Sequence, residues 1–231
     1  MWLYVKYLPV SVFGLRPSNT TSSGGKSLMC PTPYAMKLAL IDRIIRTEGE
    51  APTRVLFPLI RDLEMFLRVP EVVAVNRTFQ KIQRPAGGKE EVWNSTIAQR
   101  EFCFHMGEMT IAMAVQEDSL QTATLRHAFT AINYFGRRGG FFQWDGDVLE
   151  IDPPHENNGF VNLSASDALG TLSVGFLQRM DDIVPEATFD DISIWNPKAK
   201  GGRRSYTVIL PYELARHGAG HTVYRRNRGA L

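Results

Sequence analysis

The order of strand and helix signals along the first 140 residues limits this chain to a small set of folds. Apolar side chains occupy both parities of Trp2–Leu8, which predicts a strand buried on both faces. Thr32, as N-cap, and Pro33, as first helical residue, then open a helix that Gly49 ends. A second helix is predicted over Thr53–Arg68, before a proline. The chain therefore begins with one strand and two helices.

The following segment is rich in β-forming residues and predicts a long hairpin. Glu71–Gln83 and Val92–His105 favour strands, and Pro85-Ala86-Gly87-Gly88 between them is a turn signal. The apolar residues change parity at Gly107, as they would at a β-bulge. This hairpin is longer than an ordinary connection between two strands of a sheet requires.

A third helix, capped by Ser119 and ended by Gly136, completes the pattern, and Tyr206–Leu210 is the clearest later strand. The order strand, helix, strand, strand, helix, strand is that of a ferredoxin-like α+β domain. We expect residues 1–231 to form a single such domain, similar to RNA-recognition folds, with a thumb hairpin at about 76–100 and a basic C-terminal segment at 198–231. The topology alone does not define a function.

The composition favours a soluble cytoplasmic protein. Hydrophobic residues make up 44% of the chain, which is enough for a sizeable core. Apolar runs stay far below the roughly 18 residues of a membrane span. The two cysteines are too few for a disulfide framework or a cysteine-based zinc cluster, so we expect no membrane and no metal cofactor.

Charge is strongly segregated along the chain. Residues 141–191 hold 11 acidic side chains and one basic side chain, whereas the segments on either side are both basic. The acidic block could consist of solvated loop residues, or it could be a surface that avoids nucleic acid and meets a protein. The sequence gives the two interpretations about equal weight.

The predicted hairpin is the first of three constellations that could carry function. Its cations alternate with Phe79 and Trp93, and a regular strand would place Arg77, Phe79 and Lys81 on one face. Cations pair with phosphates and aromatic rings stack on unpaired bases. Alternatively, the hairpin is a solvated edge whose lysines prevent aggregation. The residues alone slightly favour a solvated edge hairpin over a hairpin that binds RNA.

The second constellation is Gly136-Arg137-Arg138-Gly139-Gly140. Glycines allow a close approach to a ligand, arginines grip phosphate, and backbone amides in such loops can bind anions. Alternatively, the run is a helix end whose arginines favour the helix dipole.

The third constellation is the histidine set. His105 falls on the predicted strand with parity opposite to the nearby phenylalanines, and His217 and His221 are four residues apart. The glycines between the last two disfavour a helix there, and no third ligand is close in sequence, so a metal site is not expected.

Several of these segments together resemble CRISPR-associated protein family five. The polar loop and helix of Arg16–Ile45, which include Cys30-Pro31-Thr32-Pro33, resemble the opening of that family. Arg100–Phe104 resembles the strand after its thumb, and Ile132–Arg138 resembles the hydrophobic-Gly-Arg-Arg run after its later helix. The resemblance extends over residues 1–140 and faintly over Arg203–Pro211. Leu38–Ile41 stands where many members have a glycine-rich run, which is closer to I-A-like members.

The resemblance implies a non-catalytic RNA-binding subunit of a type I Cascade surveillance complex. Such proteins belong to the repeat-associated RNA-binding superfamily (RAMP) with ferredoxin-like folds and bind the 5′ handle of the CRISPR RNA (crRNA). The implied partners are the crRNA 5′ handle, the backbone subunit and the large subunit, with target DNA met indirectly through the guide. The acidic block 141–191 is then a candidate protein-facing surface.

Cations and aromatic residues of these segments are the expected RNA contacts. The candidates are Arg16, Lys26, Lys37, Arg77, Phe79, Lys81, Arg84, Lys89, Trp93, Arg100, Arg137, Arg138, Arg203 and Arg204. Phosphate contacts would position the handle, and base contacts would specify it.

Two alternatives stay open. In one subtype the family cleaves precursor crRNA without a metal, using tyrosine, lysine and histidine, and Tyr34, Lys37 and His105 supply those residue types. They do not stand in the Lys-His pair that this subtype's pattern would require. The other alternative is a stand-alone single-stranded RNA-binding protein.

Overall fold

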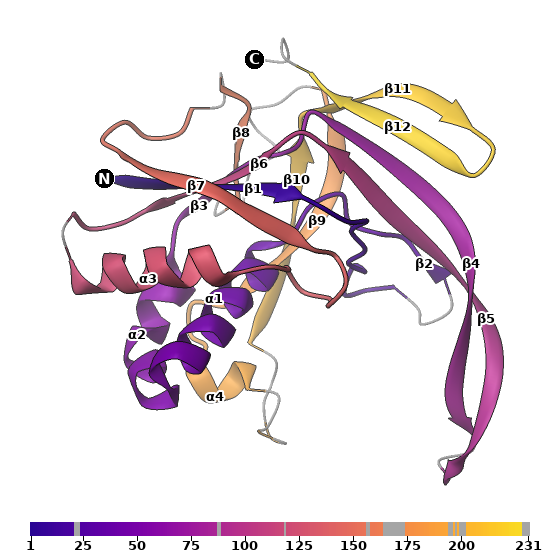
Figure 1. The fold of residues 1–231 in the computed structure, drawn as a ribbon, viewed down its shortest axis with the longest axis horizontal. Helices are drawn as coiled ribbons and strands as arrows, with labels where there is room; N and C mark the ends of the chain where they lie inside the picture. Colours follow the sequence, from indigo (N-terminus) through magenta and orange to yellow (C-terminus); the bar gives the residue numbers. More distant parts are fainter. Residues whose placement is uncertain are drawn as a thin grey trace.

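The central sheet determines the architecture of the protein. The computed structural model describes residues 1–20, 24–86, 89–117, 119–155, 158–163, 174–193, 196, 198 and 202–227 (Figure 1). Five antiparallel strands lie side by side in the order β7-β1-β6-β3-β8. Their bounds are Trp2–Pro9 (β1), Met65–Arg68 (β3), Met109–Ala114 (β6), Phe142–Glu150 (β7) and Phe160–Asn162 (β8).

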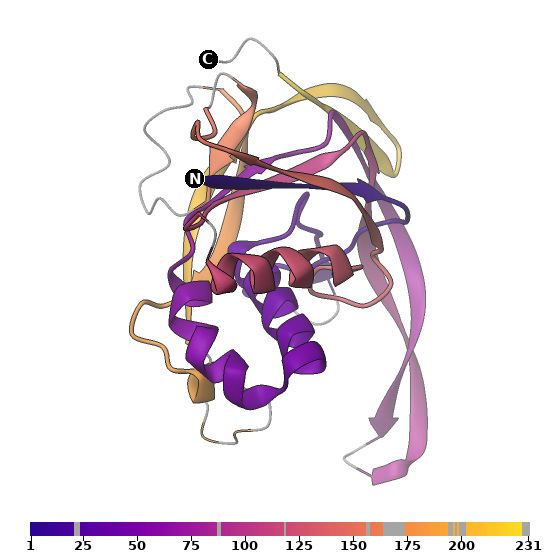
Figure 2. The ribbon, with the colours of Figure 1, turned by 60° about the vertical axis from the view of Figure 1, so that its left-hand side comes forward.

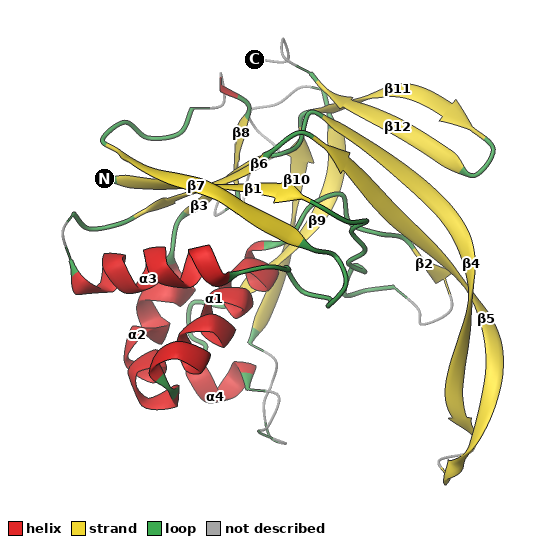
Figure 3. Ribbon diagram, viewed as in Figure 1, coloured by secondary structure: helices red, strands yellow, loops and turns green. Residues whose placement is uncertain are grey.

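The helices lie together on one side of this sheet, as Figure 3 shows. They span Pro33–Glu48 (α1), Glu50–Asp62 (α2), Leu120–Ala131 (α3) and Phe189–Ile192 (α4). Along the chain, β1, α1, β3, β6, α3 and β7 form a βαββαβ unit, so the ferredoxin-like fold class is confirmed. Among the described helices, none has the length and apolar character needed to cross a membrane.

Local signals define the start and end of α1 as expected. The Thr32 hydroxyl oxygen accepts a hydrogen bond from the Ala35 amide at 3.2 Å, and Pro33 is the first helical residue. Gly49, at φ +92°, ends the helix. In β1, Leu3, Val5 and Tyr7 are fully buried, but the opposite face is only half-buried, so the strand has one core face rather than two.

The second and third helices end earlier than predicted. The second, α2, ends at Asp62, and Met65–Arg68 is a strand because Met65 and Leu67 alternate into the core while their neighbours do not. The third, α3, ends at Ala131, not at Gly136. Tertiary burial of Ile132 and Phe135 continues the apolar pattern beyond the helix itself.

The long hairpin is present and extends beside the helical layer, with its tip at the lower right of Figures 1 and 2. It consists of Val72–Ala86 (β4) and Lys89–Met106 (β5). We call this hairpin the thumb. A second sheet, β11-β12-β4-β5-β2, supports its base, with Gly24–Gly25 (β2), Tyr212–Gly218 (β11) and His221–Arg226 (β12).

Gly107 marks the passage from the thumb to the central sheet. It has φ +94° and lies between the end of β5 and the start of β6. The parity change predicted there is therefore a change of sheet, rather than a bulge within one sheet. The predicted turn residues Gly87 and Gly88 lie outside the described residues.

A buried ion pair fastens α1 to a separate two-stranded sheet of Phe176–Ile183 (β9) and Arg203–Leu210 (β10). The Lys37 Nζ atom lies 2.8 Å from Asp182 Oδ1, and both side chains are at most 3% exposed. Arg204 approaches Asp182 Oδ2 at 3.3 Å. Lys37 also donates to the Arg61 carbonyl at 2.7 Å, which links α2 to the same point.

The ion pair gives a stability prediction. Asp182→Ala leaves the buried Lys37 ammonium without its carboxylate, and loss of one partner of a buried pair costs about 3–5 kcal/mol. The exposed Asp190–Arg54 pair is the matched control, and Asp190→Ala should change the free energy of unfolding little, because exposed ion pairs contribute little to stability. Urea unfolding followed by circular dichroism measures both. Equal losses in the two variants would contradict a special role for Asp182.

Candidate nucleic-acid interface

Three arginines from different parts of the chain converge on a groove at the base of the thumb. The groove has a volume of about 510 Å³. Its lining residues are Gly14, Leu15, Arg16, Gln80, Ile82, Arg100 and Arg137. Among the described residues that line it there is no carboxylate. We call it the arginine groove, and its charge suits a phosphate backbone.

Two of these arginines lie against the same glycine. A Cβ atom placed on Gly25 would be 3.1 Å from Arg100 Nη1 and 3.3 Å from Arg16 Cδ. The short strand β2, which pairs in parallel with β5, brings Gly25 beside Arg100. The glycine therefore makes room for two cationic side chains at one place.

The Gly-Arg-Arg loop supplies the third arginine. Gly136 has φ +77°, and a Cβ atom there would come within 2.8 Å of Leu15 Cδ1. Gly136 thus permits both the turn and its contact with the loop before α1. Because α3 ends at Ala131, Arg137 and Arg138 are not in its last turn, where a cation favours the helix dipole. Both are exposed, and Arg137 faces the arginine groove.

The thumb has two faces, and its predicted RNA contacts are divided between them. Arg100 lies on the face of the arginine groove, together with Gln80. Strand alternation places Arg77, Phe79 and Lys81 on the opposite face, as predicted from their spacing. There Phe79 is 73% exposed, and Arg77 pairs with Glu101 at 3.2 Å.

The end of the thumb is described only in part. Trp93 is exposed, and its register with Pro85 places it on the same face as Phe79. The side chains of Arg84 and Lys89 lie outside the described part of the structure. Their roles stay predictions.

Three other predicted cations lie elsewhere. Lys26 is exposed on the loop after β2. Arg203 pairs with Asp181 at 3.3 Å and stacks over the Tyr34 ring at 4.0 Å, and Arg204 pairs with Asp182. Internal carboxylates therefore neutralise part of the basic charge of β10.

Lys37 is a correction to the predicted RNA contacts. It is 2% exposed and is held by Asp182 and the Arg61 carbonyl. Burial lowers its pKa, and the attraction of Asp182 opposes this effect. Its ammonium group faces the interior and cannot reach a nucleic acid at the surface. The signal was misread because a helical lysine next to apolar residues is usually exposed.

The three residues of the possible ribonuclease site do not meet at a surface. His105 is 4% exposed, and its Nε2 atom lies 2.6 Å from the Met29 carbonyl oxygen. Burial lowers the pKa of His105 to about 4, although the Met29 hydrogen bond opposes the shift. Tyr34 is 9% exposed and lines a cavity, whereas Lys37 and His105 face the interior, so this proposed trio has no common access to RNA.

The remaining histidines lie on a β-hairpin rather than a helix. His217 is in β11 and His221 in β12, next to Arg77 and Glu101. In the described parts of the chain, no group of three or more histidine, cysteine, aspartate or glutamate side chains could hold a metal ion.

The acidic block is partly an internal feature. Asp181 and Asp182 are both buried and serve cations of α1 and β10. Asp147 pairs with Arg126 of α3, and Asp190 with Arg54. All four carboxylates are therefore paired with cations, and Asp190 is the exposed member of the set. Residues 164–173 of the block lie outside the described residues.

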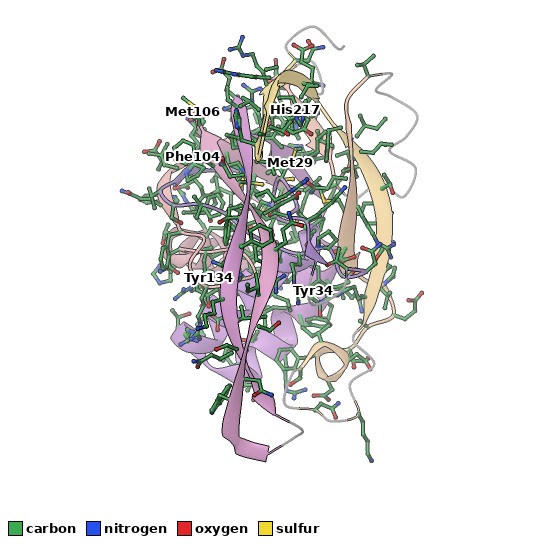
Figure 4. The ribbon with its side chains drawn as sticks, turned by 90° about the vertical axis from the view of Figure 1, so that its right-hand side faces the viewer. Met29, Tyr34, Phe104, Met106, Tyr134 and His217 are labelled. Carbon is green, nitrogen blue, oxygen red and sulfur yellow. The ribbon has the colours of Figure 1, made fainter. Side chains whose placement is uncertain are left out.

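A second cavity, which the sequence did not predict, adjoins the arginine groove. It has a volume of about 390 Å³ and shares Leu15 and Arg16 with that groove. Tyr34 and Tyr134 line it, and Figure 4 shows these two labelled side chains on either side of the thumb ribbon. Tyr134 belongs to the Ile132–Arg138 run, where the arginines were singled out and the tyrosine was not.

The fold and the groove define a ferredoxin-like α+β protein with a cationic surface at the base of a thumb. In sequence, the chain is 26% identical over 129 residues to the CRISPR-associated protein Cas5 of Archaeoglobus fulgidus. This match covers 54% of the chain and about half, 52%, of the relative's length. The resemblance to CRISPR-associated protein family five is thereby confirmed. No family model matches the chain.

Two solved structures align with this chain over nearly its whole length. A chain of a CRISPR RNA-guided surveillance complex aligns with a TM-score of 0.50 and 14% identity, covering 97% of this chain and 88% of that one. A CRISPR protein from Archaeoglobus fulgidus aligns over 98% of this chain and 92% of its own length, with a TM-score of 0.47 and 11% identity.

The buried histidine gives a prediction about pH. Because the pKa of His105 is lower in the folded protein than its ordinary value of 6.5, the unfolded chain binds a proton first as the pH falls. The contribution of the neutral His105 to the free energy of unfolding is therefore present above pH 6.5 and should be lost as the pH falls toward 4. His105→Gln, which retains an N–H donor for Met29, should remove this loss. Between pH 7 and 4.5 the wild type should lose about 2 kcal/mol more than the variant in urea unfolding. Parallel curves for the two proteins would contradict the assigned environment.

Proposed function

We propose that this chain is the crRNA-binding subunit of a type I CRISPR Cascade surveillance complex in the cytoplasm, where it caps the 5′ handle of the guide. The observation that carries the proposal is the arginine groove, formed by Arg16, Arg100 and Arg137 beside a glycine turn. The sequence similarity to Cas5 supports the CRISPR context. The function proposed is binding, without turnover of the RNA.

Handle phosphates would lie in the arginine groove. Charge-assisted hydrogen bonds from guanidinium groups to phosphate are stronger than neutral ones, and several cations at one place fix the path of a strand. Each arginine comes from a segment next to an element of the fold: Arg16 precedes α1, Arg100 lies in β5 and Arg137 follows α3. The guide would pass along the face of the thumb that carries Gln80 and Arg100, which we call the inner face.

The face that carries Arg77, Phe79 and Lys81, which we call the outer face, suits a protein or the guide duplex rather than the handle. Phe79, Ile97 and Trp93 are more than half exposed on that face, next to Lys81. Such a mixture of aromatic and cationic side chains is typical of interfaces. We assign this face to the adjacent backbone subunit and to a guide nucleotide that the thumb would kink out of the duplex with the target, as the family resemblance implies. The large subunit would contact the same assembly.

The division of the thumb into two faces gives a direct test. Arg16→Ala with Arg137→Ala removes two groove cations, so the log–log salt slope of handle binding should fall in magnitude by about 1.4, or about 0.7 for each lost phosphate contact. The matched control, Arg77→Ala with Lys81→Ala, removes two cations from the outer face and should change handle binding little. Filter-binding titrations from 50 to 300 mM salt, with a handle-only RNA, measure both. A lowered slope in the control alone would contradict the proposal, because it would place the handle on the outer face of the thumb.

A second test separates a Cascade subunit from a stand-alone RNA-binding protein. Protein purified from cells that carry a CRISPR array should retain small RNAs with one uniform 5′ sequence, because the handle is the part recognised. Sequencing of the bound RNA measures the distribution of 5′ ends. A broad distribution would favour the stand-alone protein, and the Arg16→Ala, Arg137→Ala variant is the control for nonspecific RNA.

A further inference from the structure

One side of the second sheet exposes a group of apolar side chains at the base of the thumb. Cys103 and His105 of β5 are buried in the core. The alternate residues, Phe104 and Met106, therefore point to the opposite side of the sheet. Phe104 is 48% exposed and Met106 is 55% exposed, and Figure 4 shows the two labelled residues close together. Large apolar side chains thus meet solvent at one place.

The register of the strands extends this side across the sheet. Residues that pair directly in antiparallel strands have side chains on the same side, so two rows can be followed across β5, β4, β12 and β11. The rows are Phe104, Ala74, Val223 and Arg216, and next to them Met106, Val72, Arg225 and Glu213. Each row is apolar on the two thumb strands and ends in charged side chains toward β11.

The loop after β1 adds to the apolar part of this surface. Phe13 forms an antiparallel bridge with Cys103, and both side chains are buried. Val12, which precedes Phe13, therefore lies beside Phe104 on the exposed side. The apolar surface is thus wider than the two strands of the thumb.

Two further residues continue the surface beyond Val12. The Val10 amide donates a hydrogen bond to the Phe141 carbonyl at 3.0 Å, so the segment after α3 lies against the loop after β1. We call the surface formed by Val10, Val12, Phe104, Met106 and Phe141 the apolar face, and each of these residues is between 45% and 57% exposed. Monomeric proteins rarely leave a contiguous apolar patch in water, and such a patch is typical of a docking surface.

Cations lie at both ends of the apolar face. At one end the arginine groove adjoins it, because a Cβ atom on Gly14 of the groove would be 3.2 Å from Phe102 Cδ1. Phe102 shares the side of β5 that carries Phe104. At the other end Arg216 and Arg225 are exposed, and among the residues that the structure describes neither forms an ion pair.

The nearby carboxylates offset only part of this charge. Glu213 lies opposite Arg225 across β11 and β12, and Glu71 precedes β4. Glu108, which follows β5, is already paired with a cation of the central sheet. Arg216 lies opposite an apolar residue, and the three arginines of the groove add their charge at the other end. The surroundings are cationic on balance, and complementary charge favours an acidic partner.

We propose that the apolar face binds a protein segment whose apolar side chains are flanked by carboxylates. The valines and the methionine of this face cannot stack on bases, so a protein fits it better than a single-stranded nucleic acid does. The apolar face continues the inner face of the thumb beyond the arginine groove, and it is separate from the outer face that carries Phe79. The inference therefore goes beyond the proposed function and assigns a second protein contact.

The experiment places a photo-reactive group in the apolar face. The full chain, with p-benzoylphenylalanine in place of Phe104, is irradiated in cells of its native host, and the crosslinked peptide is identified by mass spectrometry. We expect an adduct that resists ribonuclease and joins Phe104 to another protein, at a peptide in which apolar residues are interspersed with carboxylates. The same group at Leu120, which is 85% exposed on α3, should give about fivefold less adduct, because single exposed apolar residues are normal on a surface.

Charge-reversed variants test the chemistry of the partner. Arg216→Glu with Arg225→Glu should reduce the adduct yield about fivefold or more, because like charges then meet across the interface. Arg179→Glu, which reverses an exposed arginine of β9, is the matched control and should keep the yield within about twofold. Val12→Ser with Met106→Ser should also reduce the yield while changing the thermal melt little, because both side chains are about half exposed in the free chain. If that variant does not fold, the exposed arginine pair decides the question.

The other outcomes overturn the inference. An adduct that ribonuclease removes would show a nucleic acid on the apolar face, and an adduct with a second copy of this chain would show self-association. An adduct yield equal to that at Leu120, a crosslinked peptide without carboxylates, or a yield that ignores the reversal of Arg216 and Arg225 would each contradict the proposed partner. None of these results bears on RNA binding at the arginine groove, so the proposed function is tested separately.

Discussion

The buried ion pair between the Asp182 carboxylate and Lys37 is the interaction on which the rest of the site depends. The carboxylate sits at the meeting point of α1, β9 and β10, where it binds the buried Lys37 ammonium and the Arg204 guanidinium. A buried charge requires a partner in fixed geometry, so this contact sets the position of α1 relative to the two-stranded sheet. The first turn of α1 carries Tyr34, and β10 carries Arg203 above its ring. The walls of the second cavity are thus aligned by an ion pair that never reaches the surface.

The acidic and basic segments of the sequence are not separate surfaces in the folded protein. The sequence shows two basic segments on either side of an acidic one. In the structure, two buried aspartates of the acidic segment, Asp181 and Asp182, pair with Arg203 and Arg204 of the basic C-terminal segment. Arg16, Arg100 and Arg137 line one cationic groove beside the thumb, which is where we propose that RNA binds. Concentrating the cations in a groove, rather than spreading them, favours one path for a bound strand over many.

Much of the fold followed from local chemistry that is visible in the sequence. Thr32 and Pro33 defined the start of α1 because a hydroxyl cap and a fixed φ act within four residues. The long hairpin followed from β-forming residues on both sides of a glycine turn. The strand Met65–Arg68 and the end of α3 were missed because packing against the central sheet overrides local propensity there.

The sequence by itself determined the order of elements, the ferredoxin-like class and the alternation that places Arg77, Phe79 and Lys81 on one face of the thumb. These properties depend on neighbours a few positions away. Only the tertiary structure decided where these side chains lie: it buried Lys37 against Asp182, brought Arg16, Arg100 and Arg137 to one groove, and placed Tyr134 opposite α1. Burial and convergence depend on contacts between residues that are far apart in sequence, and a pattern along one strand or helix holds no record of them.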